Sequence, residues 1–240
     1  MIAVLTDYTA FLSLGFVIGM AHALEADHLA AVGAMIDRRA GRRSLILRGT
    51  VWGLGHTLSL FAISSTVVLF GLAFSGRLEA GLELAVGLMI VGLGARVLWK
   101  LRRERIHLHV HEHDGAAHLH LHSHAGEGAH HASGHDHAHP ARQHLGVLGV
   151  GMMHGAAGSA GLLVLTLAAT DSIAQALIYF AVFGLGSITG MAALTAIASY
   201  PLGAIERGAN WMKTATGLGI GGLAIWIGGG LALRSFGGLM

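Results

Sequence analysis

Long apolar stretches alternate with short charged segments along the whole chain. The stretch LFAISSTVVLFGLAF at 60–74, for example, contains no charged residue. A helix needs about 20 predominantly apolar residues to cross the hydrocarbon core of a bilayer. On this basis the pattern predicts an all-α polytopic membrane protein with six transmembrane helices, at residues 9–32, 45–72, 80–99, 144–168, 173–199 and 211–233.

The segments between these spans alternate in charge. Thirteen of the fifteen Lys and Arg residues fall on or next to one side of the predicted bundle. The positive-inside rule makes that side cytoplasmic, so we expect a multi-pass protein of the cell inner (plasma) membrane with both termini outside. The N-terminus has neither the basic region nor the cleavage site of a secretory signal, so we expect the first span to be retained.

Three short sequences recur in the second half of the chain in the same order. GMAH at 19–22 returns as GMMH at 151–154, GLGH at 53–56 as GLGS at 184–187, and GLMIVGL at 87–93 as GLGIGGL at 217–223. The pattern predicts two three-helix repeats, at 1–100 and 144–240, joined by a His-rich cytoplasmic loop at 101–143. Because three is odd, the second repeat is expected to be inverted, with a substrate site near the midplane of the membrane.

Fourteen of the eighteen histidines lie between 107 and 144, and the remaining four all fall within predicted spans. These four are His22, His28, His56 and His154, and two acids, Glu25 and Asp27, accompany the first two. A membrane histidine can simply bond a neighbouring helix. Four of them with two carboxylates favour an ion or proton path instead, because ionisable groups are costly in hydrocarbon.

The chain has no cysteine, so a metal ion must be held by imidazole and oxygen ligands. That ligand set suits nickel, cobalt, zinc or ferrous iron rather than calcium or magnesium. On a straight helix Asp27 would lie about 140° from His22, so one helix cannot direct the whole group at one ion. We therefore expect one of two arrangements. Either the helix unwinds near Ala26, or Asp27 orients a metal-binding histidine by a hydrogen bond without binding the ion itself. Gly33 and the GLGH segment are further places where the backbone could open.

The segment HALEADHLAAV at 22–32 closely resembles the H-A-x-[DE]-A-D-H-[IL]-A-A signature of the nickel/cobalt transporter family. LGHTLS at 54–59 resembles the second motif of that family, L-G-H-[ST]. The resemblance implies that His22, Asp27 and His28 are a metal-recognition triad, that His56 is the second-helix histidine and that Glu25 stands at an acidic motif position. His154 joins this candidate metal site as the repeat partner of His22.

The segment MMHGAAGSAGL at 152–162 is similar to the smaller six-span branch of the family, which includes urease-accessory nickel permeases. The eight spans and additional acidic motifs of larger members are not found in this chain. The resemblance implies uptake of nickel, with cobalt second, as the transported substrate and with no separate cofactor. It also implies a possible cytoplasmic partner, a metallochaperone or a nickel-enzyme maturation protein.

The loop between the repeats contains HLHVHEH, HLHLHSH and HDHAH, with histidine at every second residue. In an extended segment these residues would share one face and could bind several metal ions. A low-complexity linker without a role is the alternative. A metal-binding loop could buffer arriving ions, sense excess metal or collect ions for export.

Other interpretations of the whole protein stay open at this stage. They include a zinc or iron transporter, a nickel or cobalt efflux protein and, more distantly, a membrane haem protein with His22, His56 and His154 as axial ligands. A metallopeptidase is disfavoured because H-E-x-x-H is missing, so we predict no enzymatic activity. The expected partners are a divalent metal ion and the lipid bilayer, with no nucleic acid.

Two weaker features receive structural interpretations. Glu83 is expected to be an interfacial acid at the start of the third span rather than a ligand. The four tryptophans are expected to belong mostly to aromatic belts near span ends, and they are Trp52, Trp99, Trp211 and Trp226.

Overall fold

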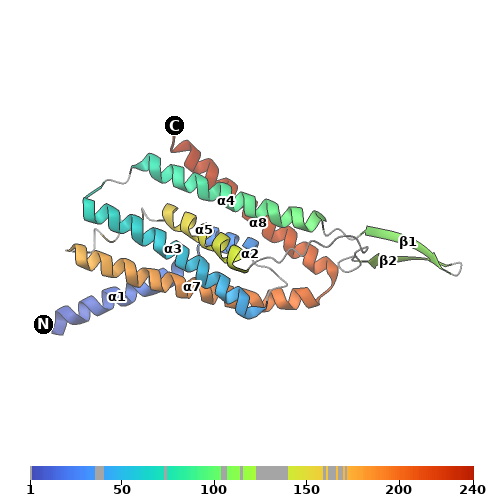
Figure 1. Cartoon of the computed structure of the whole chain (residues 1–240), viewed down its shortest axis with the longest axis horizontal. Helices are drawn as coiled ribbons and strands as arrows, with labels where there is room; N and C mark the ends of the chain where they lie inside the picture. Colours follow the sequence, from blue (N-terminus) through green and yellow to red (C-terminus); the bar gives the residue numbers. More distant parts are fainter. Residues whose placement is uncertain are drawn as a thin grey trace.

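The computed structural model describes residues 2–35, 41–72, 75–103, 107–113, 116–122, 140–158, 161, 166, 170 and 172–240. These residues form an elongated helical bundle from which a two-stranded hairpin projects (Figure 1). The helices are α1 (Ile2–His22), α2 (Ala26–Met35), α3 (Arg42–Phe70), α4 (Gly76–Arg103), α5 (Pro140–Ala157), α7 (Ile173–Arg207) and α8 (Asn210–Gly237). The strands are β1 (His107–His113) and β2 (Ala116–His122).

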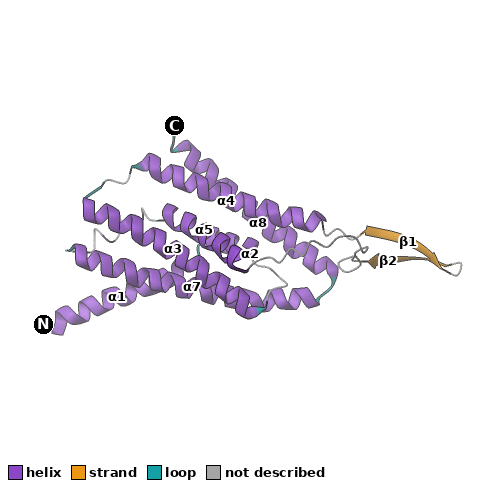
Figure 2. Ribbon diagram, viewed as in Figure 1, coloured by secondary structure: helices purple, strands orange, loops and turns teal. Residues whose placement is uncertain are grey.

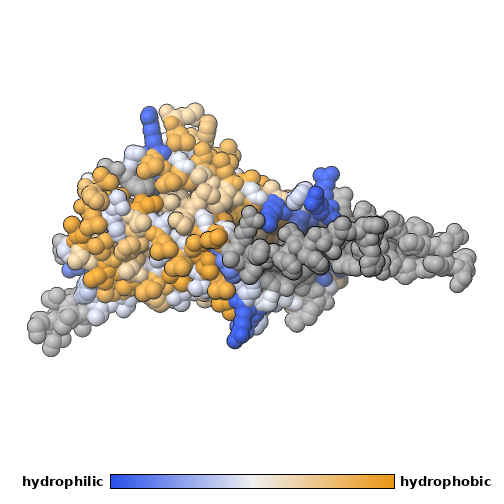
Figure 3. Space-filling view, viewed as in Figure 1, coloured by the Kyte–Doolittle hydropathy of each residue, from blue (hydrophilic) through white to orange (hydrophobic). Residues whose placement is uncertain are grey.

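Four of the described helices, α3, α4, α7 and α8, are long and apolar enough to cross a membrane. The bent pair α1 and α2 adds a fifth span if it is counted as one. An apolar surface covers much of the helical body in Figure 3. The chain is therefore a polytopic helical membrane protein. The predicted span at 144–168 begins within α5, but most of it beyond Gly158 lies outside the described residues, so six spans remain a prediction.

Part of the His-rich loop forms regular structure. β1 and β2 lie side by side (Figure 2) and pair antiparallel. His107 lies opposite His122, and the same register places two further pairs of histidine positions opposite each other. The first histidine run, at 107–113, is extended over its whole length, and so are residues 118–122 of the second run. Residues 123 and 124 of the second run lie outside the described part of the chain. The third run, at 135–139, lies outside the described residues. Metal binding by the loop stays a prediction.

α3 is the central helix and packs against both α5 and α7. α5 runs parallel to α3: a Cβ on Gly151 would overlap the carbonyl oxygen of Trp52, and one on Gly155 would overlap that of His56. Only glycine permits such close approach of two backbones, and small residues serve the same purpose at many membrane helix interfaces. The glycines of α5 thus set the distance at which the two helices pack.

α1 packs against α7 in the same manner. Gly19 meets the carbonyl oxygen of Phe183, and Gly186 meets that of Phe16. α7 runs antiparallel to α3, since Gly49 of α3 meets Met191 of α7 while Thr57, further along α3, donates a hydrogen bond of 3.1 Å to the carbonyl oxygen of Gly184. Four helices, α1, α3, α5 and α7, therefore form one connected unit.

α4 and α8 form a second, tightly packed antiparallel pair. Gly87 meets Gly228, and Gly94 meets Gly221, so the two backbones are in close contact. The Ser235 hydroxyl of α8 donates a hydrogen bond of 2.8 Å to Oε2 of Glu83. The expectation that Glu83 stands at a helix start was wrong, because this acid lies about two turns inside α4 and bonds α8. Its place at the membrane interface stays a prediction.

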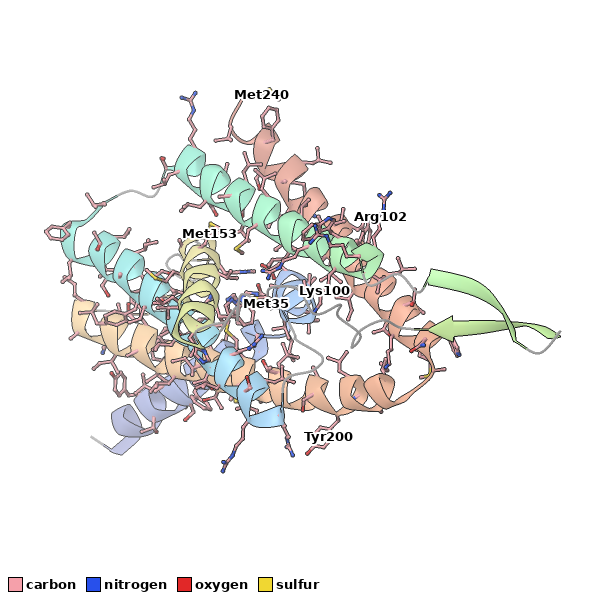
Figure 4. All side chains as sticks on the ribbon, turned by 45° about the vertical axis from the view of Figure 1, so that its right-hand side comes forward. Met35, Lys100, Arg102, Met153, Tyr200 and Met240 are labelled. Carbon is pink, nitrogen blue, oxygen red and sulfur yellow. The ribbon has the colours of Figure 1, made fainter. Side chains whose placement is uncertain are left out.

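Exposed basic residues gather at the end of the bundle from which the hairpin projects. They include Arg42 and Arg43 at the start of α3 and Lys100, Arg102 and Arg103 at the end of α4. Figure 4 labels Lys100 and Arg102 at this end, while Met240 lies toward the opposite end. We call the first end the hairpin end and the other the far end.

Candidate metal centre

The two histidines of HALEADH lie on either side of a helix break. α1 ends at His22, α2 begins at Ala26, and the two helices are bent by 53°. The amide of Glu25 bonds the carbonyl oxygen of His22 at 3.1 Å, which is the tighter i to i+3 pattern. Asp27 then stands in the first turn of α2, where a negative charge favours a helix start.

The predicted unwinding near Ala26 is confirmed by this break. GLGH at 53–56 is continuous helix within α3, and Gly33 lies inside α2, so neither of these suggested openings occurs. The bend has a chemical consequence. It allows His22 at the end of one helix and His28 near the start of the next to approach, with ring centroids 4.5 Å apart.

Each of these two histidines is held by a neighbouring carboxylate through its Nδ1 atom. Nδ1 of His22 lies 2.6 Å from Oε1 of Glu25, and Nδ1 of His28 lies 3.0 Å from Oδ1 of Asp27. A carboxylate accepts hydrogen bonds, so Nδ1 is the protonated nitrogen of each neutral ring. The Nε2 atom then carries the lone pair. This is the arrangement by which carboxylates orient metal-binding histidines.

α3 contributes a third imidazole from beside the break. The ring centroid of His56 lies 5.1 Å from that of His22 and 5.2 Å from that of His28. His56 is completely buried, and neither of its ring nitrogens has a hydrogen-bond partner within the described part of the chain. The Nε2 atoms of His22 and His28 are likewise buried and unpartnered there.

The fourth histidine comes from α5 and reaches the carboxylate between them. Nε2 of His154 lies 2.9 Å from Oδ2 of Asp27, so the two oxygens of Asp27 hold His28 and His154 respectively. His154 is 2% exposed, and its ring centroid lies 4.3 Å from that of His28. Asp27 thereby connects the second helix of the chain to α5.

Among the described residues, two groups of three side chains bring their ligand atoms within 4.8 Å of one another, and both groups include His28. One is His22, His28 and His56, and the other is Asp27, His28 and His154. Ligand nitrogens on one zinc-like ion, each about 2.1 Å from it, lie at most about 4 Å apart. The first group could therefore bind a divalent ion with movements of about 1 Å. Its unpartnered nitrogens make it the better ligand set.

All six candidate residues meet at this place: His22, Glu25, Asp27, His28, His56 and His154. Glu25 is the most exposed, with 56% of its side chain accessible, whereas the side chain of Asp27 is 27% accessible. Glu25 and Asp27 contact the Nδ1 atoms of His22 and His28, and His154 contacts Asp27. Whether any of the six binds metal stays a prediction.

Sequence reasoning missed two aromatic residues that border the histidines. The ring centroid of Trp52 lies 5.4 Å from that of His28, and Phe183 lies 5.5 Å from His22. The expectation that Trp52 belongs to a belt near a span end was wrong, because this side chain is 1% exposed in the interior. Trp99, Trp211 and Trp226 are exposed, as residues that face lipid would be. The spacing of one helical turn between Trp52 and His56 was the available signal.

Comparison with known proteins identifies a relative of this chain. The chain is 30% identical over 200 residues to urease accessory protein UreH of Bacillus sp. (strain TB-90), covering 81% of this chain and 78% of that protein. No family model matches the chain. No solved structure matches it either.

Proposed function

Because the chain belongs to the family of urease accessory protein UreH, we propose that it transports a divalent transition-metal ion across the membrane. Nickel is the first expected substrate and cobalt the second, as the sequence resemblance implies. The observation that carries the proposal is the group of His22, His28 and His56, which bring ligand nitrogens within 4.8 Å of one another. Each of the three also has a buried ring nitrogen with no hydrogen-bond partner among the described residues. Such buried imidazoles suit a borderline divalent ion.

The proposed binding step follows from the arrangement of these side chains. His22, His28 and His56 replace water molecules around the ion, while Glu25 and Asp27 hold the first two rings in the binding tautomer. The side chains of both acids are partly exposed and add negative charge beside the ligands, which favours a cation. Asp27, His28 and His154 can form a second binding site beside the first, since their ligand atoms also lie within 4.8 Å of one another.

We further propose that the six-span, inverted-repeat plan holds, with repeats at 1–100 and 144–240. Matched contacts support this plan, because Gly19 packs on Phe183 as Gly151 packs on Trp52. The two glycines are equivalent at an offset of 132 residues, and the two aromatic residues at an offset of 131. α1 is parallel to α7 and α5 to α3, while α3 is antiparallel to α7. The first helices of the two repeats therefore point in opposite directions, as inversion requires.

The orientation is proposed from charge. Exposed arginines and lysines at the hairpin end make that end cytoplasmic and leave both termini outside, in the plasma membrane. A hairpin on the cytoplasmic side could deliver or receive ions from a metallochaperone or a nickel-enzyme maturation protein. Uptake is the proposed direction, and the same site would serve a protein that exports the ion.

The other interpretations fit these contacts less well. Zinc or ferrous iron would bind similar ligands, so they are separated from nickel only by measurement. A haem would need a flat apolar space beside its axial histidines, but the rings of His22, His28 and His56 pack against one another and against two acids. The proposal is accordingly a carrier and not an enzyme.

The test is metal uptake by sealed proteoliposomes that contain the purified protein and a metal-sensitive dye. We expect Ni²⁺ and Co²⁺ to enter faster than Zn²⁺ and Fe²⁺, and Mg²⁺ not to enter above the rate of empty vesicles. Fastest transport of Zn²⁺ or Fe²⁺ would replace the nickel assignment. Failure to move any of these ions, in vesicles with verified insertion, would contradict transport itself.

A further inference from the structure

Two buried aromatic rings border the histidine cluster from different helices. Trp52 of α3 is 1% exposed and contacts both His28 and His154, with ring centroids 5.4 and 5.8 Å apart. Phe183 of α7 is 3% exposed and lies 5.5 Å from His22. Neither ring supplies a lone pair for a metal ion, so their position against the imidazoles needs another explanation.

The two rings occupy equivalent positions in the proposed repeats. Trp52 precedes His56 by one helical turn, and Phe183 precedes Ser187 by the same interval. The backbone of each residue contacts a glycine of a parallel helix, which is Gly151 for Trp52 and Gly19 for Phe183. The equivalence extends from the sequence offsets to the three-dimensional contacts.

Because α3 and α7 are antiparallel, equivalent positions lie on opposite sides of the cluster. Trp52 lies one turn from His56 toward the start of α3, which is the hairpin end of the bundle (Figure 1). Phe183 lies one turn from Ser187 toward the start of α7, which is the far end. The two rings therefore border the cluster on opposite sides, Trp52 on the hairpin side and Phe183 on the far side.

A small apolar pocket adds an independent observation on the hairpin side. It is lined by residues of α2, α3, α5 and α7, among them Leu45, Arg48 and Trp52. Leu45 and Arg48 belong to the first two turns of α3, so the pocket lies between the hairpin end and the tryptophan. Trp52 forms part of its wall and, through the same ring, contacts two histidines of the site.

We propose that Trp52 and Phe183 are paired gates, Trp52 closing the histidine site toward the hairpin end and Phe183 closing it toward the far end. This inference rests on the proposed transport function. A carrier with inverted repeats exposes its site to one side at a time, and the symmetry supplies a matching gate for each side. Bulky apolar rings keep water and hydrated ions out of a narrow passage, which is how hydrophobic constrictions act.

The test measures access to the cluster without measuring transport. The chain has no cysteine, so His56→Cys places a single thiol at the centre of the site. A small membrane-impermeant thiol reagent is added, without metal, to one face at a time of oriented membrane vesicles. We expect Trp52→Ala to speed labelling from the hairpin-end face only, and Phe183→Ala from the far-end face only. The increase should be roughly two- to tenfold, the factor that loss of one aromatic contact implies.

Matched controls separate gating from loss of packing. Val86→Ala and Ile90→Ala each remove a buried side chain from α4. Both residues belong to a cluster that contains neither Trp52 nor Phe183, so their loss should leave labelling unchanged. The milder changes Trp52→Leu and Phe183→Leu serve as second variants should an alanine variant fail to insert. Equal acceleration from both faces, or none in correctly inserted variants, would overturn the gates while leaving the transport proposal intact.

Discussion

Nε2 of His154 lies 2.9 Å from Oδ2 of Asp27, although 127 residues separate them in the chain. The other oxygen of the same carboxylate lies 3.0 Å from Nδ1 of His28. Asp27 thus connects a candidate metal ligand at the start of α2 to a histidine near the end of α5. The contact joins the two halves of the chain at the point where the candidate ligands meet.

This bridge predicts that Asp27 and His154 act together. Asp27→Asn keeps the shape of the side chain but cannot accept from both rings as a carboxylate does, so nickel affinity should fall by about 10- to 100-fold. His154→Gln should weaken binding through the same pair, and the double variant should lose less than the sum of the two free-energy changes. Titration of Ni²⁺ into the purified variants checks this. His144→Gln, also on α5, should bind as the unaltered protein does, and strictly additive losses would contradict the bridge.

The matched glycine contacts predict a specific pattern of instability. Gly151→Ala forces a methyl group into the carbonyl oxygen of Trp52 and should destabilise the protein by about 1–3 kcal/mol, the usual cost of overpacking. Gly19→Ala should have a similar effect through Phe183. Gly149→Ala, also on α5, meets nothing within 4 Å and should be neutral or slightly stabilising. Thermal unfolding in detergent distinguishes these variants, and equal stability of all three would contradict the proposed packing.

We predict that transport does not require the hairpin. Both proposed repeats are complete without residues 107–139, so a Gly/Ser linker in their place should leave insertion and the maximum transport rate unchanged. The number of ions bound per chain should fall, because the linker removes the alternating histidines. Equilibrium dialysis with Ni²⁺ measures the stoichiometry. A linker variant that inserts but carries no ion at any concentration would make the loop an obligatory part of the path.

Metal binding is predicted to depend on pH. A protonated imidazole must lose a proton before it can bind an ion, so affinity should decrease once the pH is low enough to protonate the ligands. Binding in that pH range should also release protons. Calorimetry in buffers of different ionisation enthalpy measures the release directly. Identical heats in every buffer at a pH where the affinity is decreasing would argue against histidine ligation.

Much of the site could be predicted from the sequence because its parts are local. One straight helix could not direct His22, Asp27 and His28 at a single ion, and a break near Ala26 was one of the two arrangements that this geometry allowed. The gathering of four membrane histidines also follows from the cost of ionisable groups in hydrocarbon.

What the sequence could not provide depends on how distant helices pack. Nothing in the local pattern indicates that His154 bonds Asp27, or that Trp52 is buried against His28 instead of facing lipid. Hydropathy describes how apolar a stretch is but not which side of the helix meets a neighbour. The glycine contacts determine which faces of the helices meet. They depend on the position of α3 between α5 and α7, which no local sequence pattern indicates.

The central claim is that His22, His28 and His56 carry the metal ion, and Ni²⁺ uptake by proteoliposomes containing single-histidine variants tests it most directly. Each of His22→Ala, His28→Ala and His56→Ala should insert normally and lose at least about tenfold in transport, because each removes a proposed ligand. His144→Ala removes the same kind of side chain from outside the cluster and should transport at the unaltered rate. Unaltered uptake by all three cluster variants would contradict the account.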